Sequence, residues 1–238
     1  MKNTLFGLFT LLLIFSCSDK KTEDNLQITG NIKGLNKGTL YIKKLKDTTL
    51  VLLDSIRING DSNFESHLKL DSPEMLYLFL NRGETKSIDN SIMFFAEPGK
   101  ITIESELALF YAKAKITGSK NHQLYEEYKK ISSKFNNLLL DLTVERFTAI
   151  KNHDTKLLAQ NETNYNTTLK RKYLYAINFA VNHGKYEIAP YVAISEIGDA
   201  NVKYLDTIQK SMSPKVAKSK YGALLTKHIT NRKSTDLK

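Results

Sequence analysis

The sequence predicts an α+β protein in which an antiparallel β-sandwich or open barrel precedes an α-helical hairpin or bundle. In residues 26–118, short apolar runs with strand periodicity recur about every ten residues, as in sandwiches and barrels. After Gly118 the apolar residues recur every three or four positions, which is the helical period. The charge changes near the same place, because residues 18–112 carry 12 Lys and Arg against 14 Asp and Glu, and residues 113–238 carry 22 against 11.

The first half contains about eight strand-like runs. Leu26, Ile28 and Ile32 alternate along the first run, and residues 39–44 form the second. Turn sequences rich in Gly, Pro, Asn and Asp follow at residues 34–38, 59–61, 71–74 and 97–100. A single curved sheet is the alternative arrangement that this pattern allows.

The second half begins with a long helix whose expected N-cap is Ser119. Its apolar seam consists of Leu124, Tyr128, Ile131, Phe135, Leu138 and Leu142. A second helix is expected from about Asp154 to Asn182, with Gly184 ending it, and the two should pack as an antiparallel hairpin. Shorter helices are expected at residues 188–197 and 202–212, and a last one with Ser213 as cap and Pro214 at the first helical position.

The N-terminus has the pattern of a targeting segment. Lys2 precedes an uncharged run over residues 5–15, which is shorter than the roughly 20 residues of a membrane-spanning helix. The run ends at Cys17, the only cysteine in the chain. Ile14, Ser16 and Cys17 resemble the end of a bacterial lipoprotein signal. The resemblance implies cleavage before Cys17, a diacylglycerol on its thiol and a fatty acid such as palmitate on its new amine.

This interpretation divides the chain into a signal peptide (1–16), a lipidated Cys17 with a flexible tether (17–25), a β-rich domain of unknown function (26–118) and a basic helical region (119–238). Two or three acyl chains hold a protein stably on a membrane, whereas one does so only marginally. We therefore expect a bacterial cell-envelope protein, lipid-anchored on the periplasmic face or on the surface of the outer membrane. An ordinary signal peptide with a chance cysteine is the alternative.

Several turn-rich segments carry a family resemblance: Leu53-Asp54-Ser55 with Asn59, Gly60 and Phe64, and residues 72–78, 95–103, 116–119 and 219–225. They resemble a domain of unknown function found upstream of thioredoxin-fold lipoproteins, envelope thiol-disulfide oxidoreductases of the alkyl-hydroperoxide-reductase and thiol-specific-antioxidant group. In that family the thioredoxin fold would begin where this sequence ends at Lys238. There is no Cys-x-x-Cys in the sequence, so we expect no redox chemistry.

Few residues have the spacing of a catalytic or metal site. The five histidines are far apart and none pairs with another at helical metal-site spacing: His67, His122, His153, His183 and His228. His228 shares a face with apolar residues and is interpreted as structural. Asp54 and Ser55 lack the Gly-x-Ser-x-Gly elbow of a hydrolase, and no glycine-rich loop has phosphate-binding spacing. We therefore expect no catalytic residue, metal or cofactor.

The basic second half suggests an acidic partner. Lys170, Arg171 and Lys172 form its densest run, which a solvated helix face also explains. Nine tyrosines accompany the lysines, but an envelope location argues against nucleic acid. An envelope protein, an anionic glycan or anionic lipid remains as partner. Asp47-Thr48-Thr49 resembles a short O-glycosylation signal in a loop, and similar signals at residues 54–56 and 206–208 are expected to be packed.

Three functions are compatible with these features. The first is a non-catalytic, lipid-anchored binding or assembly module of the envelope. The second is an auxiliary subunit of a separate thioredoxin-fold oxidoreductase. The third is an envelope hydrolase, which would need a pocket that groups a histidine with Asp54 or Glu97.

Overall fold

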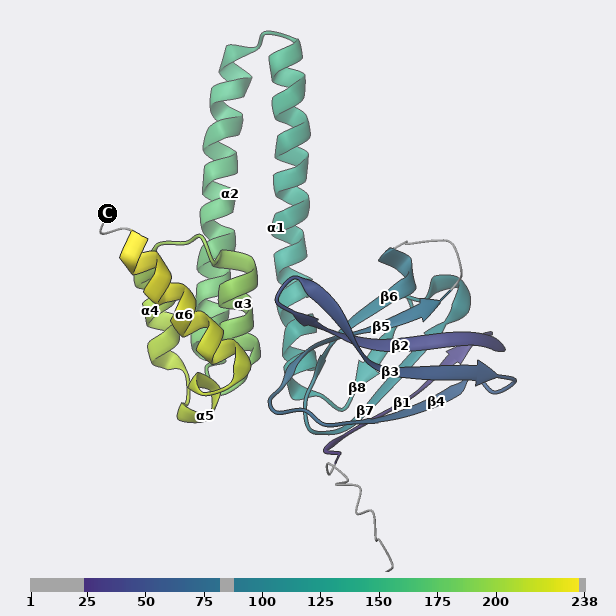
Figure 1. Ribbon diagram of the computed structural model, residues 1–238. Helices are drawn as coiled ribbons and strands as arrows, with labels where there is room; N and C mark the ends of the chain where they lie inside the picture. The colour runs from purple at the N-terminus through teal and green to yellow at the C-terminus, as the bar shows by residue number, and fades with distance from the viewer. Residues whose placement is uncertain (1–23, 82–87, 236–238) are drawn as a thin grey trace, which may run out of the picture.

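A computed structural model describes residues 24–81 and 88–235, in which eight strands precede six helices (Figure 1). The α+β class predicted from the sequence is confirmed. The strands are β1 (Leu26–Lys33), β2 (Lys37–Lys46), β3 (Thr49–Asn59), β4 (Asn63–Leu68), β5 (Glu74–Asn81), β6 (Ser91–Ala96), β7 (Gly99–Glu106) and β8 (Lys115–Thr117). Two short 3₁₀ turns lie at Ile88–Asn90 and Leu107–Leu109.

The strands form two four-stranded sheets that pack face to face as an open sandwich. One sheet has the order β4-β1-β7-β8 and the other β3-β2-β5-β6. Alternate residues of both sheets point inward and form a fully buried core: Leu26, Ile28, Ile32, Leu40, Ile42, Leu76, Leu78, Ile92, Phe94, Ile101 and Ile103. The alternation read from the sequence therefore identifies the inner faces correctly, and the sheets do not close into a barrel.

One strand pair contradicts the antiparallel prediction. β1 runs parallel to β7, with Leu26 beside Gly99 and Lys33 beside Glu106. The other five pairings are antiparallel. Parallel neighbours need a long connection, and here the whole of β2 to β6 lies between the two strands. Local periodicity reports which side chains are buried and carries no information on the direction of a distant partner.

The helical half begins with a long antiparallel hairpin, α1 (Lys120–Lys151) and α2 (Thr155–Asn182). The predicted cap of α1 is present, because the Ser119 side chain accepts from the His122 N–H. Asp154, expected only as the approximate start of the second helix, caps α2 by accepting from the Leu157 N–H. The lower part of the hairpin packs on the sandwich and on the shorter helices, whereas its upper part rises clear of both (Figure 1).

The remaining helices are α3 (Ile188–Ile197), α4 (Val202–Ser211), α5 (Pro214–Ala217) and α6 (Lys220–Thr235). The expected last helix is therefore two helices. Ser213 caps the short α5, whose first residue is Pro214. The break lies at Ser219, whose hydroxyl donates to the Val216 carbonyl and accepts from the Gly222 N–H. Such local side-chain bonds compete with helix continuation.

A second apolar core joins the helices to the outer face of the β3-β2-β5-β6 sheet. The side chains of Met75 and Phe95 project from this sheet and are buried among residues of α1, α2, α3 and α6. Phe95 lies 5.6 Å from the Tyr191 ring and 5.8 Å from the Tyr221 ring, both edge-on. Burial raises the pKa of Tyr191 to about 12, so this cluster is neutral at ordinary pH. The two halves therefore share one continuous aromatic junction.

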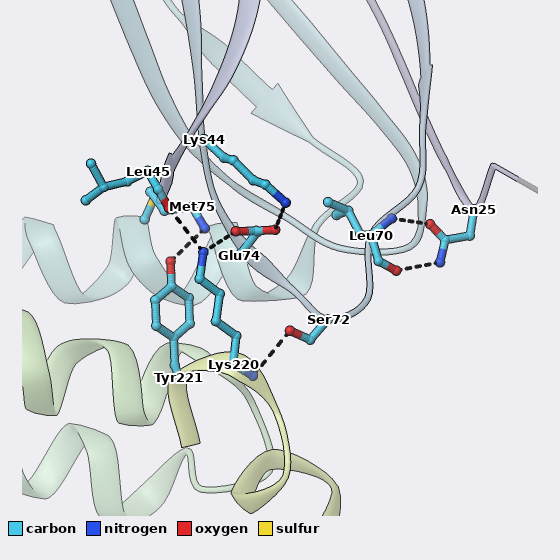
Figure 2. A network of polar contacts seen from close by, with 9 residues as sticks. All are labelled: Asn25, Lys44, Leu45, Leu70, Ser72, Glu74, Met75, Lys220 and Tyr221. Atoms are coloured by element: carbon cyan, nitrogen blue, oxygen red, sulfur yellow. Dashed lines mark hydrogen bonds and ion pairs between the residues drawn. The ribbon is translucent and has the colours of Figure 1, made fainter. Parts of the chain in front are cut away.

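Polar contacts reinforce this junction (Figure 2). The Tyr221 hydroxyl accepts from the Met75 N–H at 3.0 Å, and the Lys220 N–H donates to Ser72 at 3.3 Å. Glu74, which is 5% exposed, forms ion pairs with Lys220 and, at 3.6 Å, with Lys44. Two segments about 146 residues apart in the sequence, 72–75 and 220–221, are thus held against each other.

The chain enters the sandwich beside this junction. The Asn25 side chain makes two hydrogen bonds with the Leu70 backbone, each 2.8 Å long (Figure 2). The start of β1 therefore lies at the base of the molecule, and the turn between α1 and α2 lies at the opposite end (Figure 1). None of the helices in the described ranges is both long enough and apolar enough to cross a membrane.

Candidate binding surface along helix α1

Helix α1 has two faces with heptad spacing. The first is the predicted seam against α2, where Leu124, Tyr128 and Leu142 are buried as expected. Leu138 is an exception, because it is 47% exposed. The second face is not among the sequence predictions. It consists of residues that recur every four and three positions, His122, Glu126, Lys129, Ser133, Asn137, Leu140, Val144, Phe147 and Lys151, and we call it the outer row of α1.

The lower part of the outer row faces the sandwich. His122, Glu126, Lys129 and Ser133 line a groove of about 830 Å³ whose other wall is formed by residues 116–119. A neighbouring groove of about 370 Å³ lies between Glu126 and residues of β6 and β8. The walls combine apolar residues such as Ile116 with charged residues such as Glu126 and Lys129, so the grooves can accept an amphipathic segment.

His122 is the most constrained residue of the outer row. It is 3% exposed, and its Nδ1 accepts a hydrogen bond from the Phe95 N–H at 3.3 Å. Nε2 therefore carries the proton and lies 3.9 Å from Glu126. Burial lowers the pKa of His122, Glu126 opposes this shift, and Lys129 adds to it. A neutral, uniquely oriented imidazole fits a structural role that fixes α1 on β6.

The upper part of the outer row is apolar and exposed. Leu140 is 63% exposed, Val144 59% and Phe147 68%, and the neighbouring Ile150 is 50% exposed. Scattered single apolar residues are normal on protein surfaces, whereas a contiguous group marks an interaction site. Between Ser133 and Ile150 this face bears few charges, as the centres of protein interfaces do.

The hairpin that carries this apolar group has a specific internal structure. Asn161 of α2 is 1% exposed and donates to the Leu142 carbonyl at 2.8 Å and to the Glu145 carboxylate at 2.6 Å. His153 adopts a φ of 55° in the turn, and the Asp154 N–H donates to the Ala149 carbonyl at 2.9 Å. The exposed apolar residues are therefore not explained by a poorly formed helix.

A buried amide fixes the lower end of α1. Asn121, which is 2% exposed, donates to Glu97 at 2.6 Å and to Glu187 at 3.2 Å, and accepts from the Ile188 N–H at 2.9 Å. Glu97 also accepts from the Lys120 N–H. Glu97, considered above as a hydrolase candidate, thus serves as a cap for α1. The helix N-terminus favours this negative charge.

The other sequence candidates lie apart from one another. Asp54 accepts from Ser66 at 2.5 Å and so ties β3 to β4, and Ser55 beside it is exposed. No described groove groups Asp54 or Glu97 with a histidine. Thr207 is exposed as well, whereas Ile208 is fully buried, so the expected packing of the signals at residues 54–56 and 206–208 fails for their hydroxyl-bearing residues. Asp47 has a φ of 53° in the β2–β3 turn, in agreement with the expected loop.

The remaining histidines have local partners. His67 pairs with Glu65 at 2.8 Å, His183 bonds to the Phe179 carbonyl at 2.7 Å, and His228 bonds to the Gly198 carbonyl at 2.7 Å. Within residues 24–81 and 88–235, no three His, Cys, Asp or Glu side chains are grouped to hold a metal ion.

In the basic run, Lys172 pairs with Glu196 at 3.9 Å, and Lys170 and Arg171 are exposed on α2. Cys17, with the rest of the expected signal and tether up to residue 23, lies outside the described residues.

Comparison with protein families gives a match to a family described as a domain of unknown function, DUF4369. A DUF4369 domain spans residues 26–125. It begins with the first residue of β1 and ends in the second turn of α1, so it includes Asn121 and His122. A comparison with curated proteins finds no match. The DUF4369 domain thus contains the sandwich and the foot of α1, whereas the apolar part of the outer row lies beyond it.

Proposed function

We propose that this protein is a lipid-anchored, non-catalytic component of the bacterial cell envelope that binds another macromolecule through the outer row of α1. One observation carries the binding role: Leu140, Val144 and Phe147 form an exposed apolar group on a hairpin that projects from the body. The anchor rests on Cys17 in its lipoprotein-like context.

The position of the tether supports this arrangement. Asn25 is fixed at the base of the sandwich, so an anchor at Cys17 would hold this end near the membrane. The hairpin turn lies at the opposite end (Figure 1), and the 32 residues of α1 span about 48 Å at 1.5 Å per residue. The apolar group would then face away from the lipid, toward partners in the envelope.

We further propose that this DUF4369 domain is of the kind that precedes thioredoxin folds, so that the chain could serve such an oxidoreductase in trans. The segments that carry the family resemblance support this proposal, because they join the two halves of the chain. The contacts come from Glu74, Glu97 and Tyr221. A partner with a Cys-x-x-Cys motif would favour this second function.

The test is lysine cross-linking in cells of the affinity-tagged chain, followed by detergent extraction and mass spectrometry. Two pairs of chains are compared: wild type with Cys17→Ala, and Phe147→Glu with Ala159→Glu. Ala159 is exposed on α2, so its substitution adds the same charge away from the outer row.

We expect Phe147→Glu to reduce the amount of cross-linked protein partner at least tenfold and Ala159→Glu to leave that amount unchanged. We expect Cys17→Ala to abolish membrane association. Membrane association that survives Cys17→Ala would contradict the anchor. Equal capture by the two glutamate variants would contradict the binding surface and turn attention to anionic glycans or lipids.

A further inference from the structure

The end of the molecule where the chain enters the sandwich is built from several segments that are distant in the sequence. Figure 1 shows that α5, the start of α1 and the start of β1 lie at this end, opposite the α1–α2 turn. Two backbone bonds mark it: the Gly99 N–H donates to the Asn25 carbonyl at 2.8 Å, and the Ser213 N–H donates to the Gly184 carbonyl at 2.9 Å. We call this end the base surface, and it consists of residues 24–25, 68–71, 98–100, 184–185 and 210–218.

The base surface carries an excess of positive charge. Its acidic residues are Asp24 and Asp71. Its basic residues are six exposed lysines, Lys69, Lys100, Lys185, Lys210, Lys215 and Lys218. Neighbouring carboxylates are bonded within the molecule, Glu65 to Gln27 and His67, Glu74 to Lys44 and Lys220, and Glu97 and Glu187 to Asn121. The exposed charge of this end is therefore mainly that of lysine.

The opposite end of the molecule has a different charge balance. Residues 141–162, which include the α1–α2 turn, contain 3 Lys and Arg against 4 Asp and Glu. The expected tether does not change the balance at the base, because residues 18–23 contain two lysines and two acidic residues. The summed charges of a protein steer its approach to a charged partner. The difference along the long axis would therefore turn the base surface toward a negatively charged partner.

The expected anchor would bring this surface to the membrane. Residues 18–25 link Cys17 to the sandwich and reach at most about 26 Å, at roughly 3.3 Å per residue. A lipidated Cys17 would thus hold the base surface within that distance of the headgroups. Charges act over a Debye length of about 8 Å at physiological ionic strength, so the body must lie on the membrane for its lysines to contribute. Each lysine near an anionic membrane strengthens binding about fivefold.

We propose that the base surface binds the anionic phospholipid headgroups of the membrane that holds the anchor. The inference rests on the proposed function, because the lipid at Cys17 is what confines the base surface near the headgroups. The contact directs the hairpin away from the membrane. It thereby presents Leu140, Val144 and Phe147 to partners at the far end of the molecule.

Co-sedimentation of the full chain carrying Cys17→Ala with lipid vesicles tests the contact without the anchor. The readout is the affinity for vesicles of phosphatidylglycerol and phosphatidylcholine divided by the affinity for phosphatidylcholine alone, because the expected signal peptide would enter both kinds of vesicle alike. One variant combines Lys215→Glu with Lys218→Glu on α5. The matched control combines Lys151→Glu with Lys156→Glu, both exposed beside the α1–α2 turn, and changes the net charge equally.

At physiological ionic strength we expect a ratio of at least ten, which the α5 variant lowers at least tenfold and the control variant changes less than twofold. Equal reduction by the two variants would overturn the proposal, because net charge alone would then explain the binding. A ratio near one would overturn it as well. If such a chain were retained on heparin through Lys215 and Lys218, the base surface would instead serve an anionic glycan or an acidic protein.

The anchor is tested separately by the membrane association of Cys17→Ala in cells, after a wash at high salt. Salt screens the lysines and leaves inserted acyl chains in place. A chain held only by the base surface is therefore released, whereas a lipidated chain stays. Failure of the anchor and failure of the lipid contact thus give different results.

Discussion

At the residue scale, buried polar side chains in this protein mostly serve to join elements. Asn121, His122 and Tyr221 each accept a hydrogen bond from a backbone N–H of a distant segment. A buried donor that loses its acceptor costs about 1–3 kcal/mol. Substitutions that remove these acceptors should therefore lower the free energy of unfolding more than substitutions of exposed residues do.

His122 predicts a pH dependence of stability. Burial lowers its pKa below the ordinary value of 6.5, so the unfolded chain binds a proton at a pH where the folded chain does not. The contribution of His122 to the free energy of unfolding is thus retained above about pH 6.5 and decreases as the pH falls from there to the folded pKa. His122→Asn keeps an acceptor without titrating and should flatten this decrease in urea titrations. If the free energy of unfolding of His122→Asn fell with pH as steeply as that of the wild type, the attribution of this pH dependence to His122 would be wrong.

Tyr221→Phe tests the junction. The substitution removes the acceptor of the Met75 N–H and leaves the ring packing in place, so we expect a loss of about 1–3 kcal/mol in the free energy of unfolding. Tyr204→Phe is the control, because Tyr204 is 46% exposed and its loss should cost less than about 0.5 kcal/mol. Similar losses in urea denaturation would mean that water replaces the Tyr221 hydroxyl.

At the element scale, the change from sheet to helix depends on a glycine. Gly118 has a φ of +95°, and a Cβ there would lie 2.0 Å from the Lys100 carbonyl oxygen. β7 and β8 therefore approach each other closely because residue 118 has no side chain. Ser119 can then cap α1 directly after the turn.

Gly60 allows the two effects at Gly118 to be separated. It has the same φ of +95°, and a Cβ added there would have no atom within 4 Å. Gly60→Ala should cost about 1–2 kcal/mol for the backbone conformation alone. Gly118→Ala should cost about 1–3 kcal/mol more, because the methyl group also collides with β7. Denaturant midpoints of the two variants provide the comparison, and equal costs would show that the connection between β8 and α1 moves away from β7 freely.

At the scale of the whole molecule, the halves share a core although their charges and periodicities differ. Met75 and Phe95 are buried only because helices cover their sheet. We therefore expect β5 and α6 to exchange amide hydrogens through the same global opening, with equal protection free energies. The amide hydrogens in the part of the hairpin between Asn161 and the α1–α2 turn should exchange faster, since each helix packs only against the other there. Mass spectrometry of deuterated peptides measures this, and separate opening of β5 and α6 would indicate two independent domains.

The α+β class, the inner faces of the strands and the caps Ser119 and Ser213 could all be predicted from the sequence. These features depend on period and on side chains that bond to nearby backbone. The predicted packing of the α1 seam on α2 also holds for Leu124, Tyr128 and Leu142. Local patterns sufficed because each of these contacts is either within one element or between neighbours in the chain.

Three further features became evident only in the folded chain: the parallel pairing of β1 with β7, the role of Glu97 as a cap and the meeting of Glu74 with Lys220. Each joins segments far apart in the sequence, so no local period reports it. The outer row of α1 likewise could not be recognised as exposed from the sequence. Its heptad spacing is present in the sequence, but whether such a row is buried or exposed depends on where the neighbouring elements end. The sandwich faces the row across a groove up to Ser133, and beyond that point Leu140, Val144 and Phe147 are exposed.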